Sequence, residues 1–463
     1  MDPSTHSGRE IADEIDLEAR ISPPTATPES SLPGPQTGTP LAGLESSEER
    51  IHGRAPTIIR ALQHPDYRNF WIGNFLSNIG TWMQNVAEGW LVLQLSNSPF
   101  WLGMVGFAAT FPVTVFTIFG GVVADRVNKK RLLFTTQTVM MLCAFYLAFS
   151  TFFKFISVEQ IVIVAFISGT AMALNAPAYQ ALVPRLLPRE DLSNGIALNS
   201  AQFNMSRVLG PALGGFAMRL LGIAGNYFLN SLSFVAVLIA LTRIDYHDEP
   251  KPKEEQARII DDLRDGFRYV FGDPKMGPMV TVVTVMSLLV FPYISFLPLF
   301  ARNILNIGEP GLGMLMASSG VGAFIAAAII AQQRTVKNRG EIIMRAGLCY
   351  CVAIIVFALS KIVWLSMLTQ FGAGLSMLFM VANVNTSLQH LSSDEMRGRV
   401  MAIYATAFLG LVPIGSLVAG ALAHRIATPF VIAGMSALAL VIFIIVYFAK
   451  PELRTPGEAT VAS

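Results

Sequence analysis

The chain of 463 residues is 53% hydrophobic and only 14% charged. Soluble domains carry roughly 25% charged residues, so this composition argues against a soluble enzyme and predicts a membrane protein. The net charge of +2 says little about partners, because the charges collect between apolar runs. Cys143, Cys349 and Cys351 lie inside apolar runs and offer no disulfide framework or metal-ligand spacing, so we expect no metal and no cofactor.

Residues 1–55 form a segment rich in Pro, Ser, Thr, Glu and Gly. Such a composition buries too little apolar area to offset the entropy of ordering, so we expect a disordered tail. The segment also lacks the apolar core of a signal peptide. A short amphipathic stretch with Ile58, Ile59 and Leu62 leads from it into the first long apolar run.

Twelve runs along the chain are long and apolar enough to cross a bilayer as helices. Their approximate ranges are 69–93, 101–124, 132–153, 158–182, 194–219, 223–243, 276–301, 310–332, 341–360, 363–390, 399–423 and 427–449. We therefore expect an all-helical membrane protein, with one six-helix domain in 56–243, a second in 276–450 and a short tail at 451–463.

The longest loop, residues 244–275, carries a helical pattern of apolar residues. Ile260, Leu263, Phe267 and Val270 recur at helical spacing, with charged residues between them. This spacing is typical of an amphipathic helix lying along the membrane surface or under the bundle. A solvated linker helix fits the pattern equally well.

Lys and Arg near span ends set the orientation of a membrane protein. Twelve of them lie in the loops after the second, fourth, eighth and tenth spans, whereas the loops on the opposite side hold about five. We therefore expect a multi-pass protein of the cytoplasmic membrane, with both termini and the loop 244–275 in the cytoplasm.

A weak internal repeat predicts two similar halves. Leu102-Gly-Met104 recurs as Leu312-Gly-Met314, and residues 181–215 align without gaps on 386–420. The second alignment matches Gly210 with Gly415 and Gly215 with Gly420. Parallel repeats of this kind are related about the membrane normal.

The first span carries a stripe of polar residues at steps of three or four, which places them on one helical face. They are Asn74, Ser77, Asn78, Thr81, Gln84, Asn85 and Glu88. Polar groups facing lipid would cost several kcal/mol each, so the stripe must face protein or water. Hydrogen bonding between helices would explain it, but its length favours a wet central path. We expect that path to be lined by Asn78, Thr81, Gln84, Asn85, Asn204 and Asn383.

Glu88 is the only acidic residue deep in a span, and Arg207 is the only basic one. Intramembrane charges are costly and usually pair or serve a function. One hypothesis is that Glu88 exchanges a proton during transport while Arg207 tunes its pKa. The alternative is that Glu88 sits solvated at the outer mouth of the path.

A basic loop follows the second span: Gly121-Val-Val-Ala-Asp125-Arg126-Val-Asn-Lys129-Lys130. It resembles the loop between helices 2 and 3 of the major facilitator superfamily of membrane transporters. Where the family usually has a second glycine, this chain has Asn128, which tolerates left-handed backbone better than most residues. The resemblance implies a gating role for Gly121, Asp125 and Arg126, with Asp125 latching the start of span eleven; otherwise the cluster only sets topology.

The fifth span contains Gly210-Pro211-Ala-Leu-Gly214-Gly215. This string resembles the superfamily's antiporter motif, in which Gly-Pro is followed two residues later by Gly-Gly. Proline bends a helix and small residues allow close helix approach, so a plain packing kink is the alternative. In the second copy of the repeat, Ser416 occupies the position of Pro211, and Val412 occupies the position of Arg207.

Further strings narrow the resemblance. Gly80-Thr-Trp-Met-Gln84 and the stretch from Ser168 to Pro184 look like the branch containing the enterobactin exporters and macrolide efflux proteins. The fourth span lacks the arginine that many drug/proton antiporters carry near its start, which leaves proton coupling open.

The sequence has no enzyme motif: Gly-x-Ser-x-Gly, His-Glu-x-x-His and the phosphate loop are all missing. We expect a monomeric secondary transporter that exports an amphipathic small molecule, siderophore-like or drug-like, in exchange for protons. Its partners would be the cargo, the lipid bilayer and protons, with no nucleic acid. The alternatives are an uptake transporter of the same fold and a transporter-like scaffold or receptor without transport.

Overall fold

The computed structural model describes residues 57–244, 259–332 and 338–453, without the side chains of 57–58, 117–126 and 259–263. Contacts divide the chain into residues 1–54 and 55–463. The predicted tails, most of the central loop and the side chains of Gly121, Asp125 and Arg126 lie outside the described residues.

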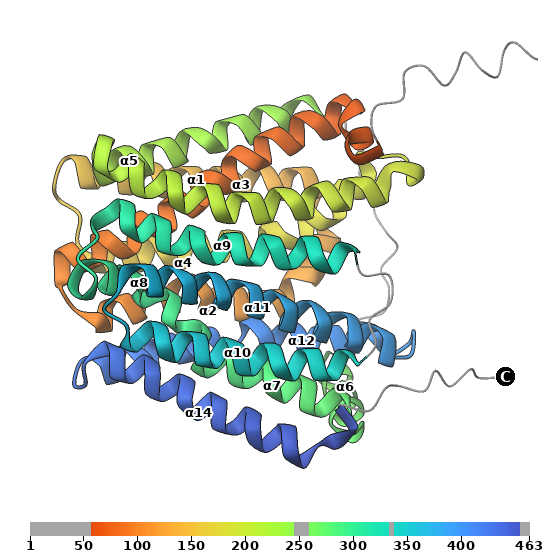
Figure 1. The fold of residues 1–463 in the computed structure, drawn as a ribbon. Helices are drawn as coiled ribbons and strands as arrows, with labels where there is room; N and C mark the ends of the chain where they lie inside the picture. Colours follow the sequence, from red (N-terminus) through yellow and green to blue (C-terminus); the bar gives the residue numbers. More distant parts are fainter. Residues whose placement is uncertain (1–56, 245–258, 333–337, 454–463) are drawn as a thin grey trace, which may run out of the picture. The chain divides into compact units, whose positions relative to one another are not determined.

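The described residues fold into helices that run side by side (Figure 1). The first part contains η1 (Thr57–Gln63), α1 (Pro65–Ser96), α2 (Pro99–Arg126), α3 (Lys129–Phe152), α4 (Val158–Leu182), η2 (Val183–Arg185), η3 (Arg189–Asp191) and α5 (Leu192–Arg243). The second part contains α6 (Ile259–Gly272), α7 (Met276–Leu289), η4 (Phe291–Phe296), α8 (Leu297–Leu299), η5 (Phe300–Ile304), α9 (Gly308–Gln332), α10 (Arg339–Leu359), α11 (Val363–Leu391), α12 (Arg397–Leu409), α13 (Val412–Ala423), α14 (Thr428–Ala449) and η6 (Pro451–Leu453).

Ten helical segments of the described chain are long and apolar enough to span a membrane. One of them, Arg189–Arg243, holds two spans, because Gly222 adopts φ +73° and breaks the helical path inside α5. The helix α1 is not among the ten, since its polar stripe lowers its mean hydropathy. Dividing α5 and adding α1 gives twelve spans, which confirms the predicted fold class.

The two halves pack in the same pattern. In the first half α3 packs against α4 and α5, and in the second half α10 packs against α11 and α14. The halves meet along two lines, where α5 packs against α9 and α2 packs against α13. We call the end of the bundle that holds α6 the linker end, and the opposite end the far end (Figure 1).

Helix starts follow local sequence. Ser157 and Gln160 form a reciprocal capping box at the start of α4. Asn128 has φ −56°, and its side chain accepts a hydrogen bond from the Arg131 N–H as the N-cap of α3. Asn128 therefore does not use the left-handed conformation that asparagine tolerates. Asn338, which precedes α10, does adopt it, with φ +61°.

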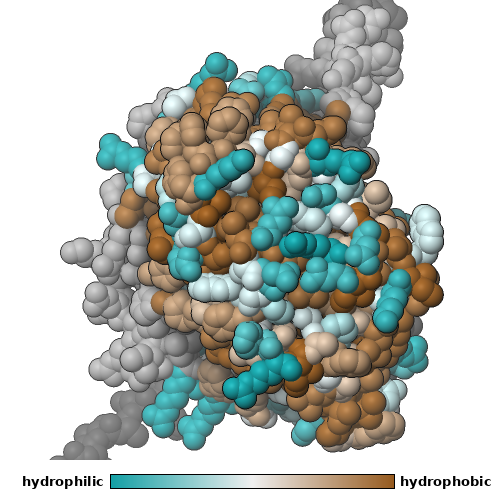
Figure 2. All heavy atoms as spheres, turned by 90° about the vertical axis from the view of Figure 1, so that its left-hand side faces the viewer, coloured by the Kyte–Doolittle hydropathy of each residue, from teal (hydrophilic) through white to brown (hydrophobic). Residues whose placement is uncertain are grey.

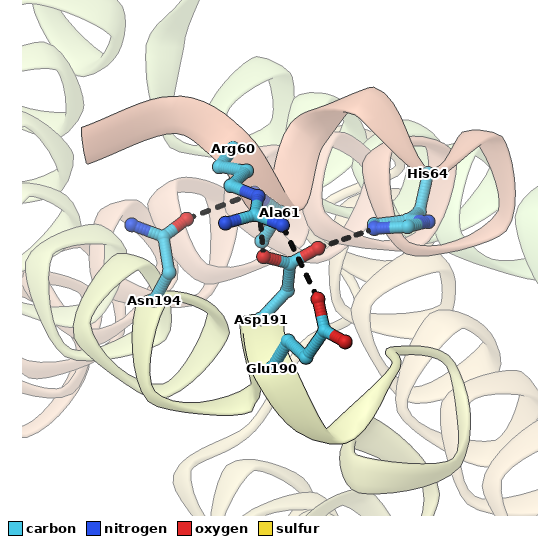
Figure 3. A network of polar contacts seen from close by, with 6 residues as sticks. All are labelled: Arg60, Ala61, His64, Glu190, Asp191 and Asn194. Carbon is cyan, nitrogen blue, oxygen red and sulfur yellow. Dashed lines mark hydrogen bonds and ion pairs between the residues drawn. The ribbon is translucent and has the colours of Figure 1, made fainter. Parts of the chain in front are cut away.

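A polar network ties η1 to the start of α5 at the linker end (Figure 3). Asp191 accepts from Arg60 Nε at 2.9 Å and lies 2.8 Å from His64 Nε2. The Ala61 N–H donates to Asn194 Oδ1 at 2.8 Å. These contacts fix the entry to α1 against the fifth span.

The second half places α6 in the corresponding position, against the start of α12. A Cβ on Gly266 would lie 2.9 Å from Ile403 Cδ1, and the Ser393 N–H donates to Tyr269 Oη at 3.4 Å. Val270 is fully buried, whereas Phe267 is 53% exposed. The helix therefore packs under the bundle through one face only.

Candidate functional site

The polar stripe of α1 divides between two environments. Gln84 is buried, and its Oε1 accepts from Asn230 Nδ2 of α5 at 2.7 Å. Asn74 donates to Tyr179 of α4 at 3.3 Å. These two residues therefore form hydrogen bonds with neighbouring helices of the first half. This agrees with the alternative explanation of the stripe, hydrogen bonding between helices.

The rest of the stripe is less buried. Asn78 and Thr81 are half-buried and Asn85 is exposed. Thr81 donates to the Ser77 carbonyl of its own helix at 2.9 Å. These three residues, rather than the whole stripe, are free to line a path.

Glu88 is half-buried and faces the interior of the first half. Gln84, one turn earlier, lies within hydrogen-bonding reach of its carboxylate. Cys143 of α3 and Tyr227 of α5 lie within electrostatic range of it. The carboxylate therefore lies among helices of the first half.

Arg207 points into the second half. Its Nη2 lies 3.6 Å from Met377 Sδ of α11, and Tyr293 and Tyr350 lie within electrostatic range. Both Glu88 and Arg207 belong to the described residues, and no ion pair joins them. Glu88 faces the first half and Arg207 faces the second, so the structure does not bring the two charges together.

Two other predicted path residues use their amides within their own helices. Asn204 Nδ2 donates to the Ser200 carbonyl at 2.9 Å, and Asn383 Nδ2 donates to the Phe379 carbonyl at 2.8 Å. Asn204 is half-buried and Asn383 is buried. Each keeps its side-chain oxygen for another partner.

The antiporter-like string lies at two helix crossings. A Cβ on Gly210 would lie 2.9 Å from the Ile79 carbonyl of α1, and one on Gly214 would lie 2.9 Å from Met83 Cα. Gly215 faces α9 instead. Pro211 is buried, and α5 continues through it. The string therefore holds α5 close to α1 on one side and α9 on the other.

Glycines of the two halves meet in pairs near the far end. A Cβ on Gly420 of α13 would lie 3.2 Å from Gly103 Cα of α2. A Cβ on Gly215 of α5 would lie 3.2 Å from Gly313 Cα of α9. Gly103 corresponds to Gly313 in the repeat, and Gly215 corresponds to Gly420, so the two crossings are equivalent. The repeated glycines were visible in the sequence, but their pairing was not.

Other contacts join the halves in the same region. Arg302 Nη1 donates to the Leu93 carbonyl of α1 at 2.8 Å, and a Cβ on Gly89 would lie 2.7 Å from Pro298 Cγ of α8. Viewed from the far end, hydrophilic side chains gather in a band between hydrophobic regions (Figure 2). We call these contacts, together with the two glycine pairs, the far-end closure.

The arrangement defines a class of protein. Twelve helices in two similar halves, joined along α5–α9 and α2–α13, form the major facilitator fold of membrane transporters. A nucleoside transporter structure matches with a TM-score of 0.64, at 13% identity, over 84% of this chain and 100% of that one. A POT family transporter in complex with a thioalcohol-conjugated peptide matches with a TM-score of 0.67, at 10% identity, over 84% and 96%. These likenesses concern the fold.

The family follows from the sequence. The model of the transmembrane secretion effector family matches residues 57–460, so the chain belongs to that family of major facilitator transporters. The staphyloferrin A transporter of Staphylococcus aureus is 24% identical over 403 residues, covering 84% of this chain and 97% of the relative. The enterobactin exporter of Shigella flexneri is 24% identical over 407 residues, covering 86% and 95%. The protein is a multi-pass membrane transporter and not an enzyme, and the predicted branch is confirmed.

Proposed function

We propose that this protein is a secondary transporter that exports an amphipathic small molecule across the cytoplasmic membrane in exchange for protons. The names of the two relatives favour a siderophore-like cargo, and one of them is an exporter. The antiporter-like string at 210–215 favours the same direction of transport. The cargo path would include Asn78, Thr81 and Asn85.

The far-end closure is the observation that carries the proposal. Its two glycine crossings are equivalent by the repeat and join the halves through two separate helix pairs, α5 with α9 and α2 with α13. A rocking motion of one half against the other would separate both crossings together. Cargo that binds the two resulting states unequally would then shift the population between them.

The distribution of Lys and Arg supports a cytoplasmic linker end and two cytoplasmic termini. In that orientation the far end would face outward, and the far-end closure would close the path to the outside. Gly121, Asp125 and Arg126 would gate the linker end in the opposite state. We propose a monomer in the bilayer, since each chain holds both halves.

Glu88 is the proposed proton carrier. It is an acidic group inside the first half, beside Gln84 and close to α3 and α5. Protonation would remove a charge from this interior and favour a different packing of α1. Arg207 faces the second half and is no partner of Glu88 in this proposal.

Accumulation in cells tests the direction of transport. Cells that express the protein or an empty vector are loaded with labelled enterobactin or with ethidium, and the retained label is measured. Export predicts lower retention than the vector for at least one probe, abolished when the pH gradient is collapsed. Higher retention would establish uptake instead. Equal retention for every probe would favour the scaffold alternative.

A further inference from the structure

Arg207 is an intramembrane cation without an acidic partner in the part of the chain that the structure describes. Its Nη2 donates to Met377 Sδ at 3.6 Å. A thioether sulfur is a weak acceptor and carries no charge. An unpaired charge away from water is costly, so such residues usually mark a functional site.

The groups around Arg207 have more donors than acceptors. Tyr293 Oη donates to Gln370 Oε1 at 2.9 Å. Gln370 is fully buried and its Nε2 has no hydrogen-bond partner. The Tyr350 hydroxyl is also buried without a partner of good geometry, with its ring 6.4 Å from that of Tyr293. Guanidinium, amide and hydroxyl donors therefore lie in one region without matching acceptors.

Close backbone contacts bring this region together from both halves. A Cβ on Gly320 of α9 would lie 2.7 Å from the Arg207 carbonyl of α5. Pro211 lacks the N–H that would bond this carbonyl in an unbroken helix. Gly374 of α11 packs on the Ser319 carbonyl in the same way. The small residues let α5, α9 and α11 approach so closely that Arg207 reaches Met377.

We propose that Arg207, Gln370 and Tyr350 bind an anionic, acceptor-rich group of the cargo, of which a carboxylate is the simplest example. The planar guanidinium suits a carboxylate because it can donate two parallel hydrogen bonds. The cargo anion supplies the charge and the acceptors that the protein lacks here. This inference rests on the proposed transport function, since it names the chemical class of the cargo.

The site also explains how cargo would act on both halves. Arg207 belongs to α5 of the first half, whereas Gln370 and Tyr350 belong to α11 and α10 of the second. An anion held by all three bridges the halves. Its affinity therefore depends on how the halves are placed, which is the differential binding that alternating access requires.

Equilibrium binding tests the site without transport. The purified protein in lipid nanodiscs is titrated with radiolabelled citrate, and with trimethyl citrate as a neutral competitor of similar shape. We expect saturable citrate binding that the ester does not displace. Absence of citrate binding at millimolar concentration, or displacement by the ester as effective as by unlabelled citrate, would overturn the proposal.

Substitutions test whether citrate binds at Arg207. Arg207→Gln is expected to weaken citrate binding about 10- to 100-fold, the loss of a charge-assisted hydrogen-bonding pair. Arg207→Lys should bind with intermediate affinity, because it keeps the charge but not the planar fork. Arg219→Gln is the matched control, since Arg219 lies on the same helix and is exposed. Equal affinity of Arg207→Gln and wild type would contradict the assignment.

Two smaller changes keep the test decisive if Arg207→Gln fails to fold. Tyr350→Phe removes one hydroxyl, and Gln370→Leu removes the side-chain amide together with the acceptor of the Tyr293 hydroxyl. Each should weaken citrate binding severalfold. Unchanged binding in both would also count against the site. Citrate binding that depends on Arg207 in a protein that moves no probe would refute transport and leave the site standing. Transport of anionic and neutral probes alike, unaffected by Arg207→Lys, would refute the site and leave transport standing.

Discussion

The two halves of the molecule agree where they touch at the far end and differ at mid-depth. Gly103 and Gly313 occupy equivalent positions, and each meets a glycine of the other half. One or two helical turns from these glycines toward the linker end, the equivalence ends, because Arg207 in α5 corresponds to Val412 in α13. The far-end closure thus contains two equivalent glycine crossings, whereas the site of Arg207 has no counterpart in the second half. Equivalent contacts allow the two glycine crossings to separate together, whereas a cargo site needs a charged residue in only one of the halves.

The largest expected effect follows from filling a glycine crossing. Gly103→Leu or Gly313→Leu places a side chain where even a Cβ would overlap the backbone of the other half. Overpacking of this kind costs about 1–3 kcal/mol, enough to shift the population about 5- to 150-fold away from the closed far end. Export should fall by a similar factor. The measurement is probe efflux.

A cysteine reporter shows whether the far end has opened. In a background with the native cysteines replaced, Asn78→Cys should react faster with a membrane-impermeant thiol reagent from the far side when Gly103→Leu is present. Gly372→Leu is the matched control, because no atom lies within 4 Å of the added Cβ. If Gly372→Leu impairs export as strongly as Gly103→Leu, the crossings are not the gate.

The second effect concerns the two intramembrane charges. It tests whether Glu88 in the first half has a different role from Arg207, which faces the second half. Glu88→Gln keeps the hydrogen-bonding shape but cannot exchange a proton. We expect about a tenfold loss of export driven by a pH gradient, with equilibrium citrate binding unchanged. Uptake of protons into proteoliposomes during export measures the coupling directly. Undiminished gradient-driven export in Glu88→Gln would remove the proton role.

The third effect concerns the division of the α1 stripe. Asn230→Leu removes the donor to Gln84 and leaves a buried acceptor unpaired, which costs about 1–3 kcal/mol of stability. Asn85→Leu changes an exposed amide one residue along α1 from Gln84 and should leave stability unchanged while altering export. Thermal unfolding in detergent measures the first effect and probe efflux the second. The opposite assignment of the two effects would mean that the stripe is not divided as the structure indicates.

The fold was predictable because span length and apolar composition are local properties. The first membrane span could be predicted despite the polar stripe of α1, since the residues between the polar ones remain apolar. The break between spans five and six was predicted between residues 219 and 223, and it falls at Gly222, where glycine permits the positive φ of the connection. At Asn128 the residue type suited two roles, and tertiary context selected the N-cap.

The site was less predictable because depth along a helix does not fix the direction in which a side chain points. The sequence suggested Glu88 and Arg207 as partners, but their helices turn them toward different neighbours. Tyr293, Tyr350 and Gln370 come from three spans of the second half and carry no local signal. The pairing with Glu88 therefore missed the groups that surround Arg207 in the second half. The latch predicted for Asp125 stays a prediction, since its side chain lies outside the described residues.

The smallest expected effect tests how the two halves fasten their entry helices. In the first half Asp191 is held by Arg60 and His64, whereas in the second half Gly266 of α6 packs against Ile403 and Arg399 of α12. The side chain of Asp191 is 7% exposed and that of Glu190 is 81% exposed. Asp191→Asn should therefore cost about 1 kcal/mol of stability, and Glu190→Gln should cost nothing measurable, as for most exposed pairs.

Salt provides the discriminating measurement for this last prediction. Raising the ionic strength screens exposed charges more than buried ones, so the Asp191→Asn difference should persist in 0.5 M salt. Equal losses from Asp191→Asn and Glu190→Gln, both abolished by salt, would mean that the first half is fastened by diffuse surface charge instead of by the buried carboxylate.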